Sequence, residues 1–283
     1  MAHSGHGMPG QPQGPMGPQP LPGVQYVVAV GSGKGGVGKT TVSVNLAVSL
    51  SKLGYKVGLL DADIYGPNVP TMLGVTRQPA VLEGNRIEPL TAHGVKFMSI
   101  GLISPGDKPM VMRGPMLHGI IKQFLQQVAW GELDFLIVDL PPGTGDVVIS
   151  LVQTVPLTGA IVVSTGSSVA LQDARKALEM FHQVNVEVLG MVENMSQMTL
   201  PSGEVIDVFG AGATEQTAKQ YGIQFLGAID LDPQLREAGD RGMPASLAGE
   251  ETARGREFAA IAKRVKERAE QVSASSEDVL EIS

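Results

Sequence analysis

The sequence predicts an α/β fold of three layers, in which a mostly parallel central sheet is covered by helices on both faces. Short runs that are apolar throughout recur along the chain, and stretches with helical spacing of apolar residues alternate with them. Continuously apolar strands are typical of a parallel sheet buried on both faces. Their alternation with helices is typical of the α/β class.

The elements can be followed in order from the first apolar run. Residues 26–30 form the first predicted strand, which leads into a glycine-rich loop and then a predicted helix at residues 41–53. Turn signals at residues 83–85 and 105–107 predict hairpin-like insertions. The other predicted strands are residues 56–60, 135–138, 160–163, 188–192 and 225–229, and the other predicted helices are residues 170–181 and 253–272.

Both ends of the chain differ in composition from the rest. Residues 1–23 contain six Gly and six Pro and no Lys, Arg, Asp or Glu. Such a stretch cannot bury enough apolar surface to offset its ordering entropy, so we expect a disordered tail. His3 and His6 are expected to belong to this tail rather than to a metal site. Residues 273–283 are acidic and are expected to form a flexible tail, which leaves residues 24–272 as one folded domain.

Composition excludes several classes of protein. The net charge of −7 argues against a general nucleic-acid binder. The chain contains no cysteine, which excludes disulfides, thiolate nucleophiles and cysteine metal sites. The sequence contains no run of 18 or more apolar residues, so no membrane-spanning helix is predicted. The start of the chain does not resemble a secretion signal. We therefore expect a cytoplasmic protein that binds neither nucleic acid nor membrane.

A phosphate-binding loop is predicted between the first strand and the first helix. The run Gly33-Lys34-Gly35-Gly36-Val37-Gly38-Lys39-Thr40 fits the P-loop pattern G-x-x-x-x-G-K-[ST] in the required context. The glycines allow backbone N–H groups to surround phosphate oxygens at the positive end of a helix. Lys39 is expected to contact the β- and γ-phosphates, Thr40 to bind Mg²⁺, and Thr41 to join the nucleotide contacts. The sequence thus predicts a P-loop ATPase domain that binds ATP and Mg²⁺.

An alternative interpretation of the same loop is a dinucleotide site. Residues 31–36 also fit G-x-G-x-x-G, and Asp61 lies where a ribose-binding acid is expected. This pattern gives no role to Gly38-Lys39-Thr40 or to a second acidic residue at a strand end. ATP binding is therefore favoured over a dinucleotide and over a glycine-rich turn without a ligand.

Acidic residues end two of the predicted strands. Asp139 follows residues 135–138 and is expected to hold Mg²⁺, usually through water. Asp63 is predicted to orient the attacking water, and Asp61 to support Mg²⁺ or the loop. Turn-capping roles are the alternative for both Asp61 and Asp63.

Lys34, early in the phosphate loop, gives the chain a resemblance to the deviant Walker A ATPases. These include partitioning and cell-division ATPases, nitrogenase iron protein and the Mrp-type (ApbC-like) iron–sulfur cluster carriers. The Mrp type is the most similar, over about residues 24–268. The motifs that carry this similarity are residues 61–70, 113–116, 138–146, 190–195 and 232–233.

The resemblance implies a function and an assembly. It implies a slow ATPase that binds iron–sulfur clusters or helps to transfer them to apoproteins. It also implies a homodimer with two nucleotides at its interface, in which Lys34 reaches the partner's ATP and Asn194 contacts the base.

The chain departs from the Mrp pattern at one place. Carriers of this type usually have a C-x-x-C pair shortly after the sequence that corresponds to Asn194-Met195-Ser196, and here both cysteines are missing. Clusters require soft thiolate ligands, with occasional histidine, so no iron–sulfur ligand is predicted. A role on clusters would then act through a cysteine-bearing scaffold or partner.

A nucleotide-switched positioning ATPase of the cell-division type is the alternative function. That class needs a membrane-seeking helix or a basic DNA-binding surface. Residues 253–272 have a narrow apolar stripe, which is expected to pack against the domain's own core rather than against lipid. The stripe consists of Phe258, Ile261, Ala262, Val265 and Val272.

Overall fold

The computed structural model describes residues 17–64, 66–103, 114–143 and 145–281, and its centre is a single eight-stranded sheet. The strands are β1 (Val24–Ser32), β2 (Val57–Asp61), β5 (Leu90–Ala92), β6 (Val95–Ser99), β7 (Leu133–Asp139), β8 (Gly159–Ser164), β9 (Val188–Asn194) and β12 (Phe225–Ile229). Their order across the sheet is β12-β9-β8-β1-β7-β2-β6-β5. All neighbouring pairs in this order are parallel except β5 and β6. The predicted, mostly parallel sheet is confirmed.

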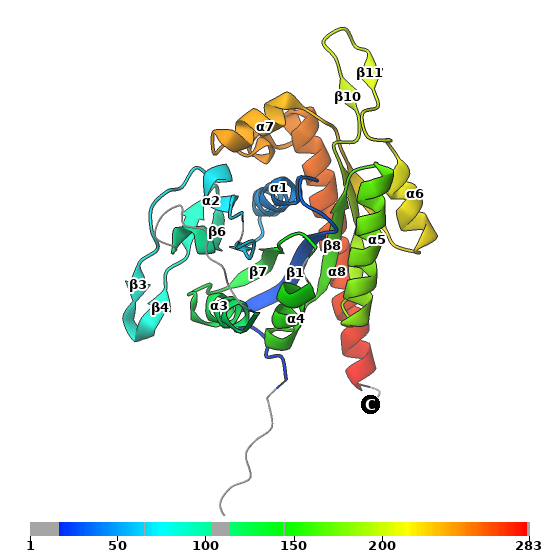
Figure 1. Cartoon of the computed structure of the whole chain (residues 1–283). Helices are drawn as coiled ribbons and strands as arrows, with labels where there is room; N and C mark the ends of the chain where they lie inside the picture. Colours follow the sequence, from blue (N-terminus) through cyan, green and yellow to red (C-terminus); the bar gives the residue numbers. More distant parts are fainter. Residues whose placement is uncertain (1–16, 65, 104–113, 144, 282–283) are drawn as a thin grey trace, which may run out of the picture.

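Helices cover both faces of the sheet (Figure 1). They are α1 (Lys39–Lys52), α2 (Val69–Met72), α3 (Gly114–Gln127), α4 (Gly145–Thr154), α5 (Ser168–Gln183), α6 (Ala213–Gln220), α7 (Pro233–Asp240) and α8 (Ala253–Glu281), with 3₁₀ helices η1 (Glu83–Asn85), η2 (Ile100–Leu102) and η3 (Ala245–Glu251). One core cluster contains α1 and α8, and a second contains α3, α4, α5 and α6. The three layers of the predicted fold class are therefore confirmed.

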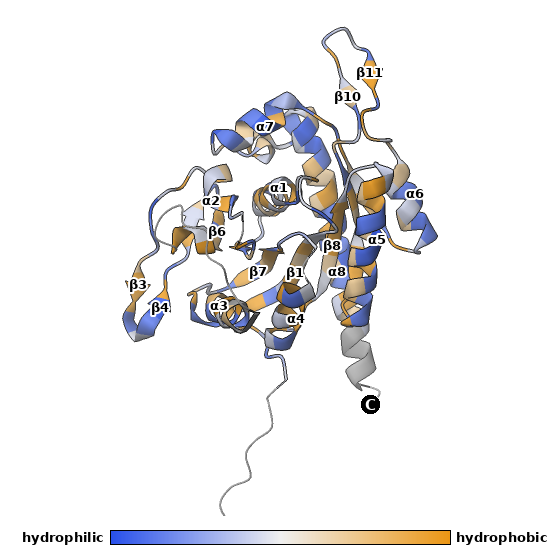
Figure 2. Ribbon diagram, viewed as in Figure 1, coloured by the Kyte–Doolittle hydropathy of each residue, from blue (hydrophilic) through white to orange (hydrophobic). Residues whose placement is uncertain are grey.

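The alternating directions of the side chains along β1 explain why helices must cover both faces of the sheet. Val28 and Val30 belong to the core cluster of α1 and α8, whereas Val27 and Ala29 belong to the cluster on the other face. Successive side chains of a strand point to opposite faces, so a strand apolar at every position must be buried on both. Figure 2 shows the result, with the central strands in hydrophobic colours.

The last helix packs against the core as expected but ends later than predicted. Phe258, Ile261 and Val265 are buried in the cluster that contains α1. The prediction that the helix ends at residue 272 and is followed by a flexible tail is wrong about secondary structure, since α8 continues to Glu281. In the part of the chain that the structure describes, no helix combines the length and the apolar character needed to cross a membrane.

The folded domain also begins earlier than predicted. Leu21, assigned to a disordered tail at residues 1–23, is buried in the second core cluster, and the backbone N–H of Gln19 donates to Thr154 O at 3.1 Å. Burial of Leu21 and this hydrogen bond attach the end of the Gly/Pro-rich segment to the domain, which composition alone did not indicate. Residues 1–16, including His3 and His6, lie outside the described residues.

Two hairpins extend from the layers. The predicted insertion at residues 83–85 is confirmed as a hairpin of β3 (Val81–Leu82) and β4 (Arg86–Ile87). The one predicted at 105–107 lies outside the described residues. A further hairpin, of β10 (Met198–Thr199) and β11 (Val205–Ile206), was not predicted and projects from the body between β9 and α6 (Figure 1).

Candidate functional site

The loop between β1 and α1 has the backbone geometry that its glycines were expected to allow. Gly36 and Gly38 adopt left-handed conformations, with φ of 83° and 78°, which side chains rarely tolerate. Gly38 is the N-cap of α1, so the N–H groups of the first helical turn face the loop. A Cβ on Gly33 would overlap the backbone of Asp173 on α5, so the loop fits only with glycine there.

This loop forms one wall of a cleft with a volume of about 440 Å³. The opposite wall comes from the chain after β12 and from α7, including Asp230, Asp232 and Arg236. These residues were not predicted as site residues, although residues 232–233 were among the motifs of the family resemblance. Asp232 caps α7 by accepting a hydrogen bond from Gln234 N at 2.8 Å, and Arg254 forms an ion pair with Asp230 at 3.3 Å.

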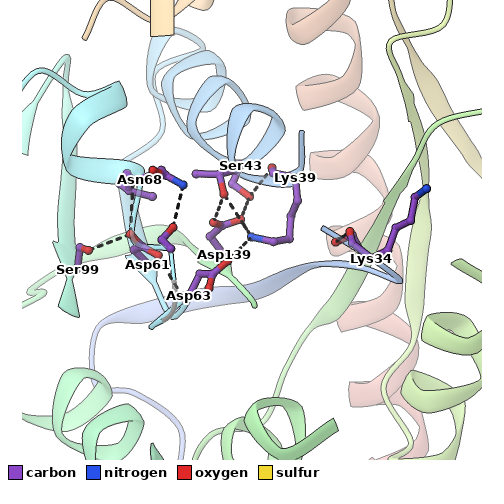
Figure 3. A network of polar contacts seen from close by, with 12 residues as sticks. Lys34, Lys39, Ser43, Asp61, Asp63, Asn68, Ser99 and Asp139 are labelled. Carbon is purple, nitrogen blue, oxygen red and sulfur yellow. Dashed lines mark hydrogen bonds and ion pairs between the residues drawn. The ribbon is translucent and has the colours of Figure 1, made fainter. Parts of the chain in front are cut away.

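Lys39 lies at the centre of a buried polar network (Figure 3). Its ammonium Nζ lies 2.8 Å from Asp139 Oδ1 and 3.9 Å from Asp63 Oδ2. Thr40 Oγ1 donates to Asp139 Oδ2 at 2.7 Å, and Ser43 Oγ donates to Asp139 Oδ1 at 2.6 Å. The structure thus brings together Lys39, Thr40, Asp63 and Asp139, which the sequence predicted as site residues.

Ser43 is a member of this network that the sequence analysis missed. It lies four residues after Lys39 and therefore on the same face of α1. Its hydroxyl also approaches Lys39 O at 3.1 Å. Its spacing of four residues from Lys39 was the one feature of the sequence that could have indicated Ser43. That spacing is a weak signal without the contact to Asp139, which only the structure shows.

Asp61 and Asp139 lie side by side at the ends of β2 and β7, where they are paired in register. Asp61 is fully buried and accepts hydrogen bonds from Ser99 Oγ at 2.8 Å, Asp63 N at 3.1 Å and Val69 N at 3.3 Å. Burial, and then the negative charge of Asp139, raises the pKa of Asp61 to about 8. Asp61 therefore holds the loop that carries Asp63, which agrees with the loop-supporting interpretation.

The raised pKa of Asp61 predicts how stability changes with pH. An unfolded carboxyl loses its proton near pH 3.8, but folded Asp61 keeps it until about pH 8. Between these values the folded state binds more protons than the unfolded state, so the free energy of unfolding should fall as the pH rises. Because one proton is involved, the equilibrium constant of unfolding can change by at most about tenfold per pH unit. Asp61→Asn, which is neutral, should lose this dependence.

Urea unfolding of the nucleotide-free protein across this pH range measures the effect. The variant should gain stability relative to the wild type as the pH rises, and the exposed control Asp207→Asn should follow the wild type. Parallel profiles for Asp61→Asn and the wild type would contradict the assignment.

Asn194, at the end of β9, lies directly against the phosphate loop. Its Nδ2 donates to Val37 O at 2.9 Å, and a Cβ on Gly38 would overlap the same amide group. The side chain is buried, and its Oδ1 has no hydrogen-bond partner among the described residues. Asn194 therefore contacts the loop backbone and also lines the cleft, where the expected base contact would be made.

Of the four predicted catalytic residues, Lys34, Lys39, Asp63 and Asp139, Lys34 does not join the network. It is half-buried, lines the cleft, and points away from Lys39 and Asp139 (Figure 3). Thr41 lines the cleft as predicted. Three residues of the family motifs, Tyr65, Arg113 and Thr144, lie outside the described residues.

The oxygen atoms beside the phosphate loop fit Mg²⁺ only in part. Thr40 Oγ1 and Asp139 are hard oxygen donors of the kind that Mg²⁺ prefers. Among the described residues, no three His, Cys, Asp or Glu side chains gather as a metal site. This suits an ion that is held by one or two protein groups together with water and substrate phosphates. Thr40 and Asp139 would hold such an ion.

Three features define a P-loop NTPase: a parallel sheet, a glycine-rich loop at the start of α1, and Lys39, Thr40 and Asp139 beside that loop. A sequence model of the family described as "ParA: NUBPL iron-transfer P-loop NTPase" matches residues 23–266. The chain belongs to this family. The resemblance to deviant Walker A ATPases is thereby confirmed.

Known proteins agree with this assignment. The chain is 49% identical over 248 residues to an "iron-sulfur cluster carrier protein" from Synechocystis, covering 86% of this chain and 70% of the relative. It is 52% identical over 245 residues to a protein of the same description from Deinococcus radiodurans, covering 86% and 69%. A nucleotide-binding protein from Archaeoglobus fulgidus, solved in complex with ADP, superimposes with a TM-score of 0.68 and 39% identity, covering 79% of this chain and 88% of that one. The carrier interpretation is therefore supported over the positioning ATPase.

Proposed function

We propose that this chain is a Mg²⁺-dependent ATPase that acts on iron–sulfur clusters without holding them through thiolates of its own. The observation that carries the ATPase part is the arrangement of Lys39, Thr40 and Asp139 at the phosphate loop. An ammonium, a hydroxyl and a carboxylate meet there within hydrogen-bond distance of one another. These are the groups that phosphoryl transfer uses to bind phosphates and a metal ion.

The roles of the residues follow from their positions. The backbone from Gly33 to Gly38 binds the phosphates, and Lys39 leaves Asp139 to contact the β- and γ-phosphates. Thr40 and Asp139 would hold Mg²⁺, whose positive charge would offset charge that develops on the phosphates. Asp63 orients the attacking water from the loop that Asp61 fixes. Asn194 and Thr41 complete the nucleotide contacts, with the Oδ1 of Asn194 available to the base.

A homodimer completes the site. Lys34 lines the cleft but points away from Lys39 and Asp139 of its own chain, which supports its assignment to the site of a second copy (Figure 3). A second copy across the cleft would do this, and each Lys34 would then reach the ATP of its partner. A positive charge supplied in this way stabilises the transition state, as an arginine finger does.

The cluster is substrate in this scheme. The relatives are described as iron–sulfur cluster carriers, which supports a role in cluster transfer to apoproteins. The segment where the Mrp resemblance places the missing cysteines is the projecting β10–β11 hairpin. Its oxygen-bearing side chains, such as Ser202 and Glu204, are hard ligands that favour other metals. Cluster ligation therefore falls to a cysteine-bearing partner.

We expect anaerobic reconstitution of this chain with iron and sulfide to give a colourless protein after desalting. A bridging [4Fe–4S] cluster needs four thiolates, two from each subunit, and the chain has none. Iron and sulfide analysis with a visible absorption spectrum measures the outcome, and a cysteine-ligated ferredoxin treated in parallel shows that the procedure works. Stoichiometric iron and sulfide with a visible absorption band that survives desalting would refute this part of the proposal.

A further inference from the structure

The β10–β11 hairpin depends on its base for its position. Each of its strands contributes two residues to the pairing, Met198 opposite Ile206 and Thr199 opposite Val205. It projects from the body of the molecule (Figure 1). Val205 in β11 is 54% exposed, and Val208, just after the hairpin, is 45% exposed. A two-stranded hairpin of this size is at best marginally stable in water. The contacts where it joins the body must therefore fix its orientation.

One side chain, Glu193, holds both ends of the hairpin. It is fully buried. Its Oε1 accepts from Ser196 Oγ at 2.6 Å, just before the hairpin, and from Gly212 N at 2.9 Å, just after it. Its Oε2 accepts from Thr214 N at 2.9 Å, in the first turn of α6. Loss of these donors would leave a buried carboxylate without hydrogen bonds, which is strongly unfavourable. The contacts of Glu193 therefore hold both ends of the hairpin in place.

The next residue in the chain, Asn194, contacts the phosphate loop. Because neighbouring side chains of a strand point to opposite faces, β9 presents Glu193 to α6 and Asn194 to Val37 O. No flexible segment separates the two contacts. A change of the loop backbone at Val37 or Gly38 therefore acts directly on Asn194, which is adjacent in the chain to Glu193, the residue that holds the hairpin.

The turn that follows is also tightly constrained. Met195 adopts a left-handed conformation with φ of 56°, which is uncommon for a residue other than glycine. Ser196 N donates to Ile229 O at 3.0 Å. At the other end of the hairpin, Gly210 packs so closely on Gly166, in the β8–α5 loop, that a Cβ on Gly166 would overlap it. The hairpin base therefore has little room to move independently of the carboxyl ends of β8 and β12.

We propose that Glu193 is a positioning residue that couples the phosphate loop to the β10–β11 hairpin, so that nucleotide binding in the cleft changes how the hairpin is held. This inference rests on the proposed nucleotide binding. Coupling of this kind is reciprocal, because whatever the nucleotide does to the hairpin, a partner bound to the hairpin must do to nucleotide affinity.

Hydrogen–deuterium exchange of the full chain, with and without ADP and Mg²⁺, tests the coupling. In the wild type, ADP should slow exchange both at the phosphate loop and in peptides covering residues 197–214, the latter by about fivefold or more. In Glu193→Gln, one N–H at the base loses its acceptor. The phosphate loop should keep its protection in this variant, while the response of residues 197–214 should be largely lost.

Glu204→Gln is the matched control, since it makes the same chemical change on an exposed residue of the same hairpin. It should respond to ADP as the wild type does. Should Glu193→Gln unfold, Ser196→Ala removes one donor only and should weaken the same response. Protection of the loop without any response of the wild-type hairpin would overturn this inference and leave the proposed function intact. Absence of protection at the loop itself would contradict both.

Discussion

Replacing Lys39 with alanine is expected to weaken ATP binding by at least about a hundredfold and to reduce turnover to background, because it removes a charge-assisted contact to phosphate. The structure adds a complication to this variant. Without Lys39, the buried carboxylate of Asp139 keeps its two hydroxyl partners, Thr40 and Ser43, but loses its cation. Removal of one partner of a buried ion pair destabilises the fold, so stability must be measured separately from binding.

Calorimetric titration with ATP and Mg²⁺, a phosphate-release assay and thermal unfolding together make this separation. Lys52→Ala is the control, because Lys52 is an exposed lysine at the opposite end of the same helix. It should bind and hydrolyse ATP as the wild type does. Wild-type affinity and turnover in a folded Lys39→Ala protein would show that the cleft is not the phosphate site.

Replacing Lys34 with alanine is expected to leave ATP binding nearly intact and to slow turnover on the order of a thousandfold, by analogy with arginine fingers. The physical reason is that Lys34 does not face its own Lys39 network but would face the partner's nucleotide. Light scattering with a non-hydrolysable ATP analogue should detect the dimer. A chain that stays monomeric at all concentrations with the analogue would exclude this arrangement.

Mixing two inactive variants decides between action within and across chains. In a mixed dimer of Lys34→Ala and Lys39→Ala, the site built on the Lys34→Ala chain keeps its own Lys39 and receives Lys34 from the other chain. Random mixing should restore about a quarter of the wild-type rate, since half of the dimers are mixed and each has one intact site. No recovery would indicate that Lys34 acts within its own chain.

The sequence predicted the elements whose patterns are local and missed those that tertiary packing decides. The predicted strand at 225–229 coincides with β12 (Phe225–Ile229). Helix α4 was missed because Val147, Val148 and Ile149 are β-branched and favour strands, and packing of Val147 and Val148 in the core outweighs that preference. Strand β6 was missed because Lys96 interrupts its apolar run, and that lysine instead donates to Trp130 O.

The same distinction holds for the site. Residues 33–40 form one continuous motif, and the aspartates at positions 61, 63 and 139 end predicted strands, so both groups could be found from the sequence. The contacts of Ser99 with Asp61, and of Asn194 with Val37, join residues 38 and 157 positions apart. The sequence does not give the order of the strands across the sheet, so it cannot indicate such pairs.

The ion pair between Lys39 and Asp139 has a consequence for which form of the nucleotide the cleft should accept. The Lys39 ammonium is the counter-ion of the fully buried carboxylate of Asp139. In the proposed mechanism Lys39 moves to the phosphates, so the charge of Asp139 would lose its compensation just as the negative charge of the nucleotide arrives. A buried, uncompensated carboxylate costs several kcal/mol. A divalent ion that enters with the nucleotide restores the balance, whereas free ATP leaves it unrestored. The ion pair between Lys39 and Asp139 would therefore make the protein selective for the metal-complexed nucleotide through charge balance, before any chemistry occurs.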